Sequence, residues 1–307
     1  MQDFIISMLP SFMMGILARI YMIRIDQRQY PSYPQGLISH FTLGIIAAFL
    51  GAVALPALVE KEFGAVTFLA VAAQQFRDVR SMERESLDNI EPTELVQRGT
   101  AYIEDIAKAF EARNYMVILT SLSTSLTIYC VRIIYTNVYV EVISGIGVGT
   151  IVMLFLKFIL MRQSIRQIGE VKSAKMVFDG PILLVNDVII TNVGLDATKE
   201  FYLKYGLAAE IIPRDENAIE TLANVGQGQT ILHNIYVQLG IKRDSDDVEY
   251  IPFAKRNLET GTMIIICIPL IKDENLLLES IKGTPVLETA KRKTLDKNSL
   301  KKSFRRN

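Results

Sequence analysis

Few residues in this sequence are candidates for catalysis. The acidic candidates lie in two places. Asp179 and Asp187 lie in a strand-like apolar segment, and Glu111 comes just before the fourth long apolar run. Carboxyl groups act as general acids or bases, so these three are the candidates for catalysis in a hydrolase, with Ser121 and Ser125 as candidate nucleophiles. The alternative for the two serines is hydrogen bonding to backbone carbonyls inside apolar helices.

A second group of charged and polar residues has helical spacing. Three arginines at i, i+3 and i+7 share one face of a predicted helix, and a second polar helix leads into the fourth apolar run. We interpret these residues as a docking face for an anionic group or for the C-terminal domain, with a salt-bridged helix as the alternative. The candidate docking residues are Arg77, Asp78, Arg80, Glu83, Arg84, Glu104, Arg113 and Asn114. Inside the bundle we expect Glu111 and Arg113 to pair with Arg132, Glu141 or Lys157.

Several classes of site are excluded by the motifs that the sequence lacks. His40 and His233 are the only histidines, so a zinc site of the HExxH type cannot form. GxSxG, Walker and GxGxxG motifs do not occur. Cys130 and Cys267 have neither metal-binding nor disulfide spacing. We therefore expect no metal and no cofactor.

The first half of the chain is predicted to lie in a membrane. The 307 residues are 50% hydrophobic with a mean hydropathy of +0.26, and four apolar runs have the length of a spanning helix. These runs are residues 4–23, 37–58, 115–135 and 138–160. A fifth run, residues 63–76, is shorter, and whether it crosses is open. Clusters of basic residues favour five crossings with the N-terminus outside and the C-terminal part in the cytoplasm.

The predicted fold is therefore mixed. An all-α transmembrane bundle of about five spans (residues 1–170, with a cytoplasmic helical loop at 77–114) precedes a small cytoplasmic α+β domain at residues 171–292. Within that domain, residues 180–194 predict two strands around Asn186 and Asp187, and the apolar run 263–270 predicts a central strand. Residues 293–307 form a basic tail that we expect to be disordered, with contact to anionic lipid as the alternative.

Five stretches resemble the YIEGIA family of membrane proteins from endospore-forming bacteria. They are YIEDIA at residues 102–107, FEARNY at 110–115, FRDVRSMERE at 76–85, DGPILLVNDVIITNVGL at 179–195 and ETGTMIIICIPL at 259–270. The resemblance covers nearly the whole chain and implies a membrane protein connected with spore formation, without assigning an active site. Asp105 stands where the family name has Gly. An Asp in mid-helix is tolerable at an exposed position, so this departure puts in doubt only a close backbone approach there.

Three functions follow as hypotheses. The first is a regulatory or scaffolding protein of sporulation, anchored in the lipid bilayer, whose cytoplasmic domain engages a protein partner. The second is a membrane-tethered regulatory protease that uses the carboxylates and serines named above. The third is a transporter or channel, suggested by ionisable residues within the spans. Glycine-rich helix faces also favour a homo-oligomer, and we expect no nucleic-acid partner.

Overall fold

The computed structural model describes residues 2–26, 34–242 and 250–291 and divides the chain into two compact units. The first unit contains Met1–Ser86 and Ile106–Met161, and the second contains Leu87–Asp105 and Arg162–Asn307. The chain therefore passes between the units three times. Residues 87–105, which belong to the stretch that the sequence assigned to a loop of the membrane domain, are part of the second unit.

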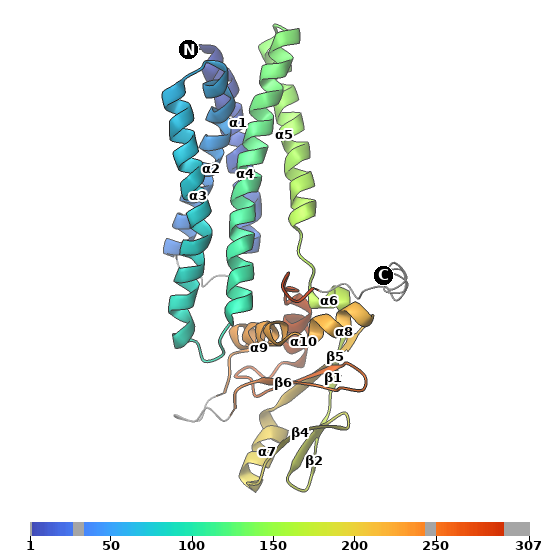
Figure 1. Ribbon diagram of the computed structural model, residues 1–307. Coiled ribbons are helices and arrows are strands. Elements are labelled where there is room, and N and C mark those ends of the chain that lie inside the picture. Colours follow the sequence, from blue (N-terminus) through green and yellow to red (C-terminus); the bar gives the residue numbers. More distant parts are fainter. Residues whose placement is uncertain (1, 27–33, 243–249, 292–307) are drawn as a thin grey trace, which may run out of the picture. The chain divides into compact units, whose positions relative to one another are not determined.

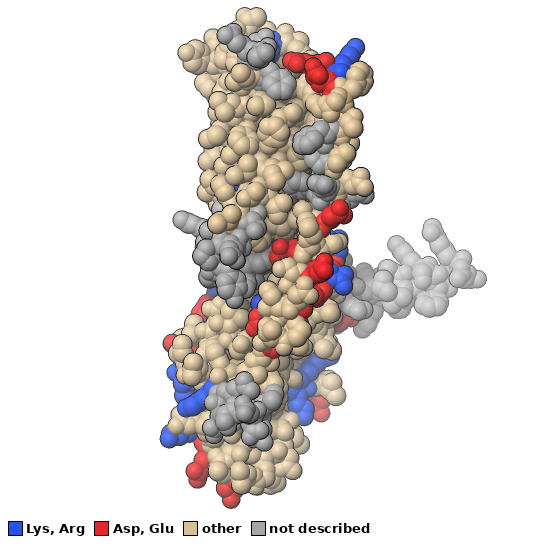
Figure 2. Space-filling view, turned by 90° about the vertical axis from the view of Figure 1, so that its left-hand side faces the viewer, with Lys and Arg blue, Asp and Glu red and all other residues tan. Residues whose placement is uncertain are grey.

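Five long helices supply the first unit (Figure 1). They are α1 Gln2–Asp26, α2 Pro34–Val59, α3 Phe63–Ile90, α4 Thr100–Ile134 and α5 Val138–Leu160. By length and composition, four of them can cross a membrane, namely α1, α2, α4 and α5. The prediction of an N-terminal helical membrane bundle is confirmed, and the chain is a multi-pass membrane protein. In Figure 2 these helices present a broad surface with few charged side chains, as contact with lipid requires.

Helix α3 is not among these four candidates, although it is long enough to cross. Its 28 residues correspond to about 42 Å at 1.5 Å per residue, more than the hydrocarbon core requires. In Figure 1 it runs along the helical unit beside α4, and an ion pair between Arg80 and Glu111 links these two helices. The apolar run at residues 63–76 is thus the first half of one continuous helix.

Small residues allow the helices of the first unit to approach closely. A Cβ on Gly51 would lie 2.4 Å from the Ile118 carbonyl oxygen, and one on Gly145 would lie 2.5 Å from Ile128 Cγ1. Both distances are too short for any side chain, so these glycines are required where α2 and α5 pack on α4. In the sequence, the Gly-rich stretch of α5 favoured an oligomer. Gly145 and Gly149 pack within the chain, whereas Gly147 of the same helix has no atom within 4 Å of an added Cβ, and the homo-oligomer stays a prediction.

The second unit is a small α+β fold, as the sequence predicts. Its helices are α6 Ile165–Ile168, α7 Asp196–Tyr205, α8 Glu216–Leu222, α9 Val225–Leu239 and α10 Glu274–Gly283, with a 3₁₀ turn, η1, at Glu91–Thr93. Its strands are β1 Gly169–Ala174, β2 Met176–Asp179, β3 Ile182–Val185, β4 Val188–Asn192, β5 Leu207–Pro213, β6 Phe253–Arg256 and β7 Met263–Cys267. One antiparallel sheet has the order β1-β5-β7-β6, and a smaller one has the order β2-β3-β4.

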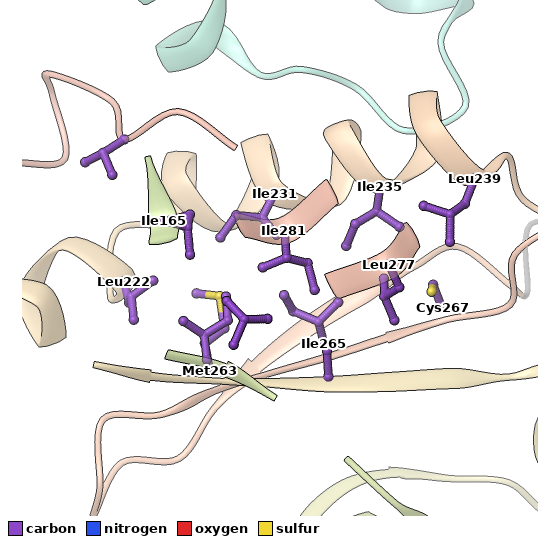
Figure 3. Close-up of a cluster of buried hydrophobic side chains, with 14 residues drawn as sticks. Ile165, Leu222, Ile231, Ile235, Leu239, Met263, Ile265, Cys267, Leu277 and Ile281 are labelled. Atoms are coloured by element: carbon purple, nitrogen blue, oxygen red, sulfur yellow. The ribbon is translucent and has the colours of Figure 1, made fainter. Parts of the chain in front are cut away.

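The larger sheet is buried on both faces. Ile265 and Cys267 point to one face, where they pack with α9 and α10 around a core that includes Ile235 and Leu277 (Figure 3). Ile264 points to the other face, toward the smaller sheet and α7. Two buried faces explain why β7 reads as an unbroken apolar run instead of alternating, and β7 is an interior strand as predicted. The basic tail at 293–307 lies outside the described residues.

Candidate functional site

The best-defined polar arrangement in the second unit is the attachment of residues 87–105, which we call the connecting segment. It links α3 to α4 and includes the first residues of α4. Its backbone is held by side chains of α9. His233 Nδ1 lies 2.6 Å from the Val96 carbonyl oxygen, and Gln229 donates to the carbonyl of Gln97. A carbonyl only accepts, so His233 carries its proton on Nδ1.

A charged cluster stabilises the bend of the connecting segment. Arg98 is buried, and its guanidinium lies 3.1 Å from a Glu94 carboxylate oxygen and 3.6 Å from one of Glu91. Glu91 also accepts a hydrogen bond from the amide of Gly99, whose φ of +81° is a conformation that glycine adopts without strain. These contacts fix the chain just before α4 begins.

At the other end of the connecting segment lies a buried ion pair. Asp105 Oδ2 is 2.7 Å from Arg162 Nη1, and Asp105 Oδ1 accepts from the amide of Glu288 at 3.3 Å. Arg162 also donates to the backbone carbonyl of Asp105. Asp105 is only 1% exposed, so it does not occupy the exposed kind of position at which an Asp is readily tolerated in a helix. The helical spacing of the sequence could not show the partner that allows this burial, because Arg162 lies 57 residues downstream.

Burial also sets the state of the histidine on α9. The surroundings of His233 are apolar on one side and include the ring of Tyr102, whose centroid is 6.3 Å away. Desolvation by burial, aided by the nearby Arg98 guanidinium, holds the pKa of His233 below its usual value. His233 is therefore a neutral donor that anchors the connecting segment at neutral pH.

A second polar arrangement lies inside the first unit. Arg19 of α1 is 1% exposed, donates through Nε to the His40 carbonyl at 3.1 Å, and lies 5.5 Å above the centroid of the Phe110 ring. Arg113 and Asn114 follow Phe110 by one helical turn and are 4% and 1% exposed. Arg19, His40 and Phe110 are in contact with one another, and Arg113 and Asn114 are buried on the same helix as Phe110. Two of the eight candidate docking residues thus lie in the interior.

Comparison with known proteins identifies the family of the chain. The family model described as "YIEGIA protein" matches residues 7–297. The chain belongs to the YIEGIA family. The protein named "Uncharacterized protein YphB" from Bacillus subtilis (strain 168) is 39% identical over 290 residues, which cover 94% of this chain and 95% of that protein. No solved structure matches.

The YIEGIA motif has a structural role in this chain. Tyr102 and Ile103 of the YIED sequence are buried in the second unit, and Asp105 forms the ion pair with Arg162. The first four residues of the motif therefore belong to the second unit, where they are part of its packing and its ion pairs. Arg162, Arg98 and His233 complete this arrangement, and none of them was named as a site residue from the sequence. Arg162 and His233 lie far along the chain from their partners. Arg98 and Glu94 are only four residues apart, and this spacing was a local signal for their ion pair.

The three candidate catalytic carboxylates of this YIEGIA protein are divided between the two units. Asp179 and Asp187 are exposed and lie at opposite ends of β3, Asp179 before the β2–β3 turn and Asp187 in the β3–β4 turn. Asn186 and Asp187 both have positive φ, 44° and 66°, which is the conformation of a two-residue hairpin turn. Glu111 lies in the other unit, 3.8 Å from Arg80.

The candidate serines donate to backbone carbonyls. Ser121 Oγ lies 2.8 Å from the carbonyl oxygens of both Ser11 and Ala48, and Ser125 Oγ lies 3.5 Å from that of Ala52. A nucleophilic serine needs a hydrogen bond from its hydroxyl to a general base, and here the hydroxyl proton is donated to a backbone carbonyl instead. These contacts join α4 to α1 and α2, which is the structural alternative considered for these residues.

The candidate docking residues of α3 and α4 are spread over different environments. Asp78 and Arg84 are exposed, Glu83 and Glu104 are half-buried, and the side chain of Arg77 lies outside the described part of the structure. Of the candidate residues, Arg80 and Glu111 are brought together as an ion pair. From the sequence, Glu111 is expected to pair with a charged residue of the bundle such as Arg132 or Lys157. In the structure Arg132 pairs with Glu141 at 3.0 Å, and Lys157 contacts Tyr21.

No group of three or more His, Cys, Asp or Glu side chains that could hold a metal ion occurs among the residues that the structure describes. Cys267 is buried in β7, and burial raises the pKa of its thiol to about 12, so it is a poor nucleophile. The best-defined polar groups of the second unit are used for contacts within the unit.

Proposed function

We propose that this protein is a membrane-anchored regulatory or scaffolding protein of sporulation, whose second unit lies in the cytoplasm and engages a protein partner. The observation that carries this proposal is the Asp105–Arg162 ion pair. These two residues stand at two of the three places where the chain passes between the units. The pair joins the two separate stretches of sequence that make up the second unit, so this unit is held together as one folded domain that could present a partner site.

The charges of the first unit support an anchoring role over transport. Arg132 pairs with Glu141, Lys157 lies 4.3 Å from the Tyr21 ring centroid, and Arg19 stacks over Phe110. Each of these side chains connects two helices of the bundle. Polar side chains that bond between helices stabilise the packing of a membrane bundle, so these contacts account for the ionisable groups without an ion path.

The cytoplasmic orientation is supported by the distribution of basic residues. Arg80 and Arg84 lie in the second half of α3, and Arg162, Arg166 and Lys172 follow α5. Arginine and lysine near the ends of spans accumulate on the cytoplasmic side. This orientation brings α3 across the membrane as a fifth span.

The function is tested with the tagged full-length protein, purified from sporulating cells of an endospore-forming host after mild cross-linking. Each captured protein is then purified and its affinity for the full-length protein in lipid nanodiscs is measured. The proposal requires a partner that binds and is recovered intact. Absence of any reproducible binding partner contradicts it, and cleavage of the partner by the purified protein would establish the protease alternative instead.

A variant with Asp105→Ala connects the structure to this result. We expect it to bind the partner more weakly at equal abundance in the membrane, because the two stretches of sequence that make up the second unit are no longer held together by this ion pair. The exposed pair Arg166–Glu279 provides the matched control. Glu279→Ala removes the carboxylate partner of Arg166, in the same unit, and leaves the connecting segment unchanged. It should therefore leave partner binding unchanged.

A further inference from the structure

Three segments of the second unit meet at the C-terminal end of α7. Lys272 donates through Nζ to the carbonyl of Lys204, in the last turn of α7. The amide of Lys242, just after α9, donates to the Ile268 carbonyl at 2.9 Å, and the amide of Ile271 donates to the Leu239 carbonyl at 3.2 Å. The ends of α7, α9 and β7 are therefore adjacent.

This junction brings three ammonium groups together. Lys242 Nζ lies 3.4 Å from the centroid of the Tyr205 ring, and Lys204 Nζ lies 5.0 Å from the same centroid. We call Lys204, Tyr205, Lys242 and Lys272 the basic patch. Among the described residues, no Asp or Glu forms an ion pair with any of its three lysines. The hydrogen bond and charge of Lys204, followed by the charge of Lys242, lower the pKa of the Tyr205 hydroxyl.

Exposed apolar side chains border the basic patch. Leu203 is 53% exposed, Leu270 69% and Ile271 54%, and each is next or next but one in sequence to a lysine of the patch. Behind them the ring of Phe201 lies 4.8 Å from those of Tyr205 and Tyr250, measured between centroids. Large apolar side chains gathered beside charges on a soluble surface are typical of a protein-binding site.

Helix capping explains only part of this arrangement. A lysine beside the last carbonyls of a helix is favourable because it offsets the negative end of the helix dipole, which accounts for Lys272 and Lys204. Capping does not account for Lys242. This lysine follows α9, and its ammonium group approaches the Tyr205 ring, which Lys204 already contacts. Nor does capping account for the exposed leucine and isoleucine.

We propose that the basic patch and its apolar border bind an acidic segment of a partner protein, with Leu, Ile or Phe side chains among the carboxylates. The positive charge selects carboxylates. The apolar border favours a peptide over a free anion, because a free anion has no apolar side chain to bury against the border. This inference rests on the proposed function, because it names the chemistry of the partner that the second unit engages.

The probe is a fluorescent peptide in which glutamate and leucine alternate in pairs, titrated into the full-length protein in phosphatidylcholine nanodiscs. The Lys204→Gln, Lys242→Gln, Lys272→Gln triple variant should weaken binding at least about tenfold, because charge complementarity is lost. A matched control removes the same charge elsewhere in this unit, through Lys172→Gln, Lys175→Gln and Arg214→Gln, and should bind like the unchanged protein. Equal weakening in both variants would show non-specific attraction and overturn the proposal.

Two single variants keep the test informative if the triple variant folds poorly. Lys204→Glu reverses an exposed charge, and Ile271→Asn removes an exposed apolar side chain of the border. Each should weaken the peptide several-fold, and a Glu-only peptide should lose its sensitivity to Ile271→Asn. Insensitivity of the Glu-Leu peptide to both variants contradicts the proposal.

A final arm separates a protein partner from a membrane. Nanodisc-held protein is mixed with phosphatidylglycerol vesicles, and tethering is followed by light scattering. Lysine-dependent tethering without lysine-dependent peptide binding would assign the patch to lipid and overturn the proposal. The two proposals can also fail separately. A captured partner whose affinity is unchanged in the lysine variants preserves the proposed function but refutes this site, whereas failure to find any partner refutes the proposed function itself.

Discussion

Asp105 and Arg162 form a buried ion pair, with 2.7 Å between Asp105 Oδ2 and Arg162 Nη1. Asp105 lies in the second turn of α4, and Arg162 lies two residues after the end of α5. Asp105 is almost fully buried, while the Arg162 side chain is 19% exposed. Removal of one member would leave the other charge in a poorly solvated position. Removal of both members leaves no unpaired charge and should cost less. This difference makes the pair a sensitive test of the structure.

Asp105→Ala should lower the free energy of unfolding of the second unit by about 3 kcal/mol, because Arg162 then lacks its counter-charge. Arg162→Ala should cost a similar amount. The double variant should cost clearly less than the sum of the two. Chemical unfolding of the detergent-solubilised protein, followed by fluorescence of a label on the second unit, measures these differences. Additive effects would contradict a direct interaction, and Glu279→Ala serves as a surface control with little or no change.

Acid should loosen the connecting segment through His233. Its pKa is lowered in the folded protein, so below the usual histidine pKa of 6.5 the unfolded chain binds protons more readily. Stability contributed by the neutral ring is therefore present above pH 6.5 and is lost as the pH falls below it. Hydrogen exchange of the amides at residues 96–99, corrected for intrinsic rates, should accelerate between pH 7.5 and 5.5.

The matched variant for this pH effect is His233→Asn. Its side-chain amide can donate to the Val96 carbonyl from nearly the same position as Nδ1, yet it does not titrate. We expect the variant to retain protection at pH 7.5 and to show a flatter pH dependence than the unchanged protein. Identical pH dependence in both proteins would assign the effect to other groups.

The close approach of α2 and α4 should make Gly51 intolerant of any side chain. Gly51→Ala introduces a Cβ at 2.4 Å from a backbone oxygen, and the helices must separate. A loss of about 1–3 kcal/mol is typical of such overpacking. Gly147→Ala on α5 has nothing within 4 Å of the added carbon, and it should leave the melting temperature in detergent unchanged or slightly raised. Equal effects at the two sites would exclude the packing described for α2 and α4.

Ser121→Ala separates a structural from a catalytic serine. The hydroxyl donates to two backbone carbonyls, and its loss should cost about 0.6 kcal/mol. Membrane abundance and partner binding should remain close to normal. Accumulation of an uncleaved target in cells that carry this variant at normal abundance would support the protease alternative.

Helix α3 should place its two ends on opposite sides of the membrane. Single cysteines at Glu60→Cys, before α3, and at Asn89→Cys, near its end, are introduced into a Cys130→Ala background. Both positions are exposed, and Cys267 is buried in β7. A membrane-impermeant maleimide applied to intact protoplasts should label the first and not the second. Labelling of both from the same side would mean that α3 does not cross.

The sequence predicted the parts of this fold that depend on local patterns. Long apolar runs predicted the spanning helices, and the unbroken run of β7 predicted an interior strand, because both signals lie within a few consecutive residues. Strand β6 was missed, since Phe253–Arg256 is short and half-polar and becomes a strand only by pairing with β7. The site was harder to predict, because Asp105 and His233 find their partners across long separations in sequence.

The division of the second unit into two stretches of sequence imposes an order on its formation. The connecting segment leaves the ribosome about 120 residues before α9, on the order of ten seconds at ordinary rates of synthesis. During that interval Val96, Ile103 and Asp105 have no surface to bury against, while α4 and α5 are being inserted. Chains that end prematurely before α9 would keep these residues exposed permanently, so incomplete products should be recognised by membrane quality-control proteases and only full-length chains should persist.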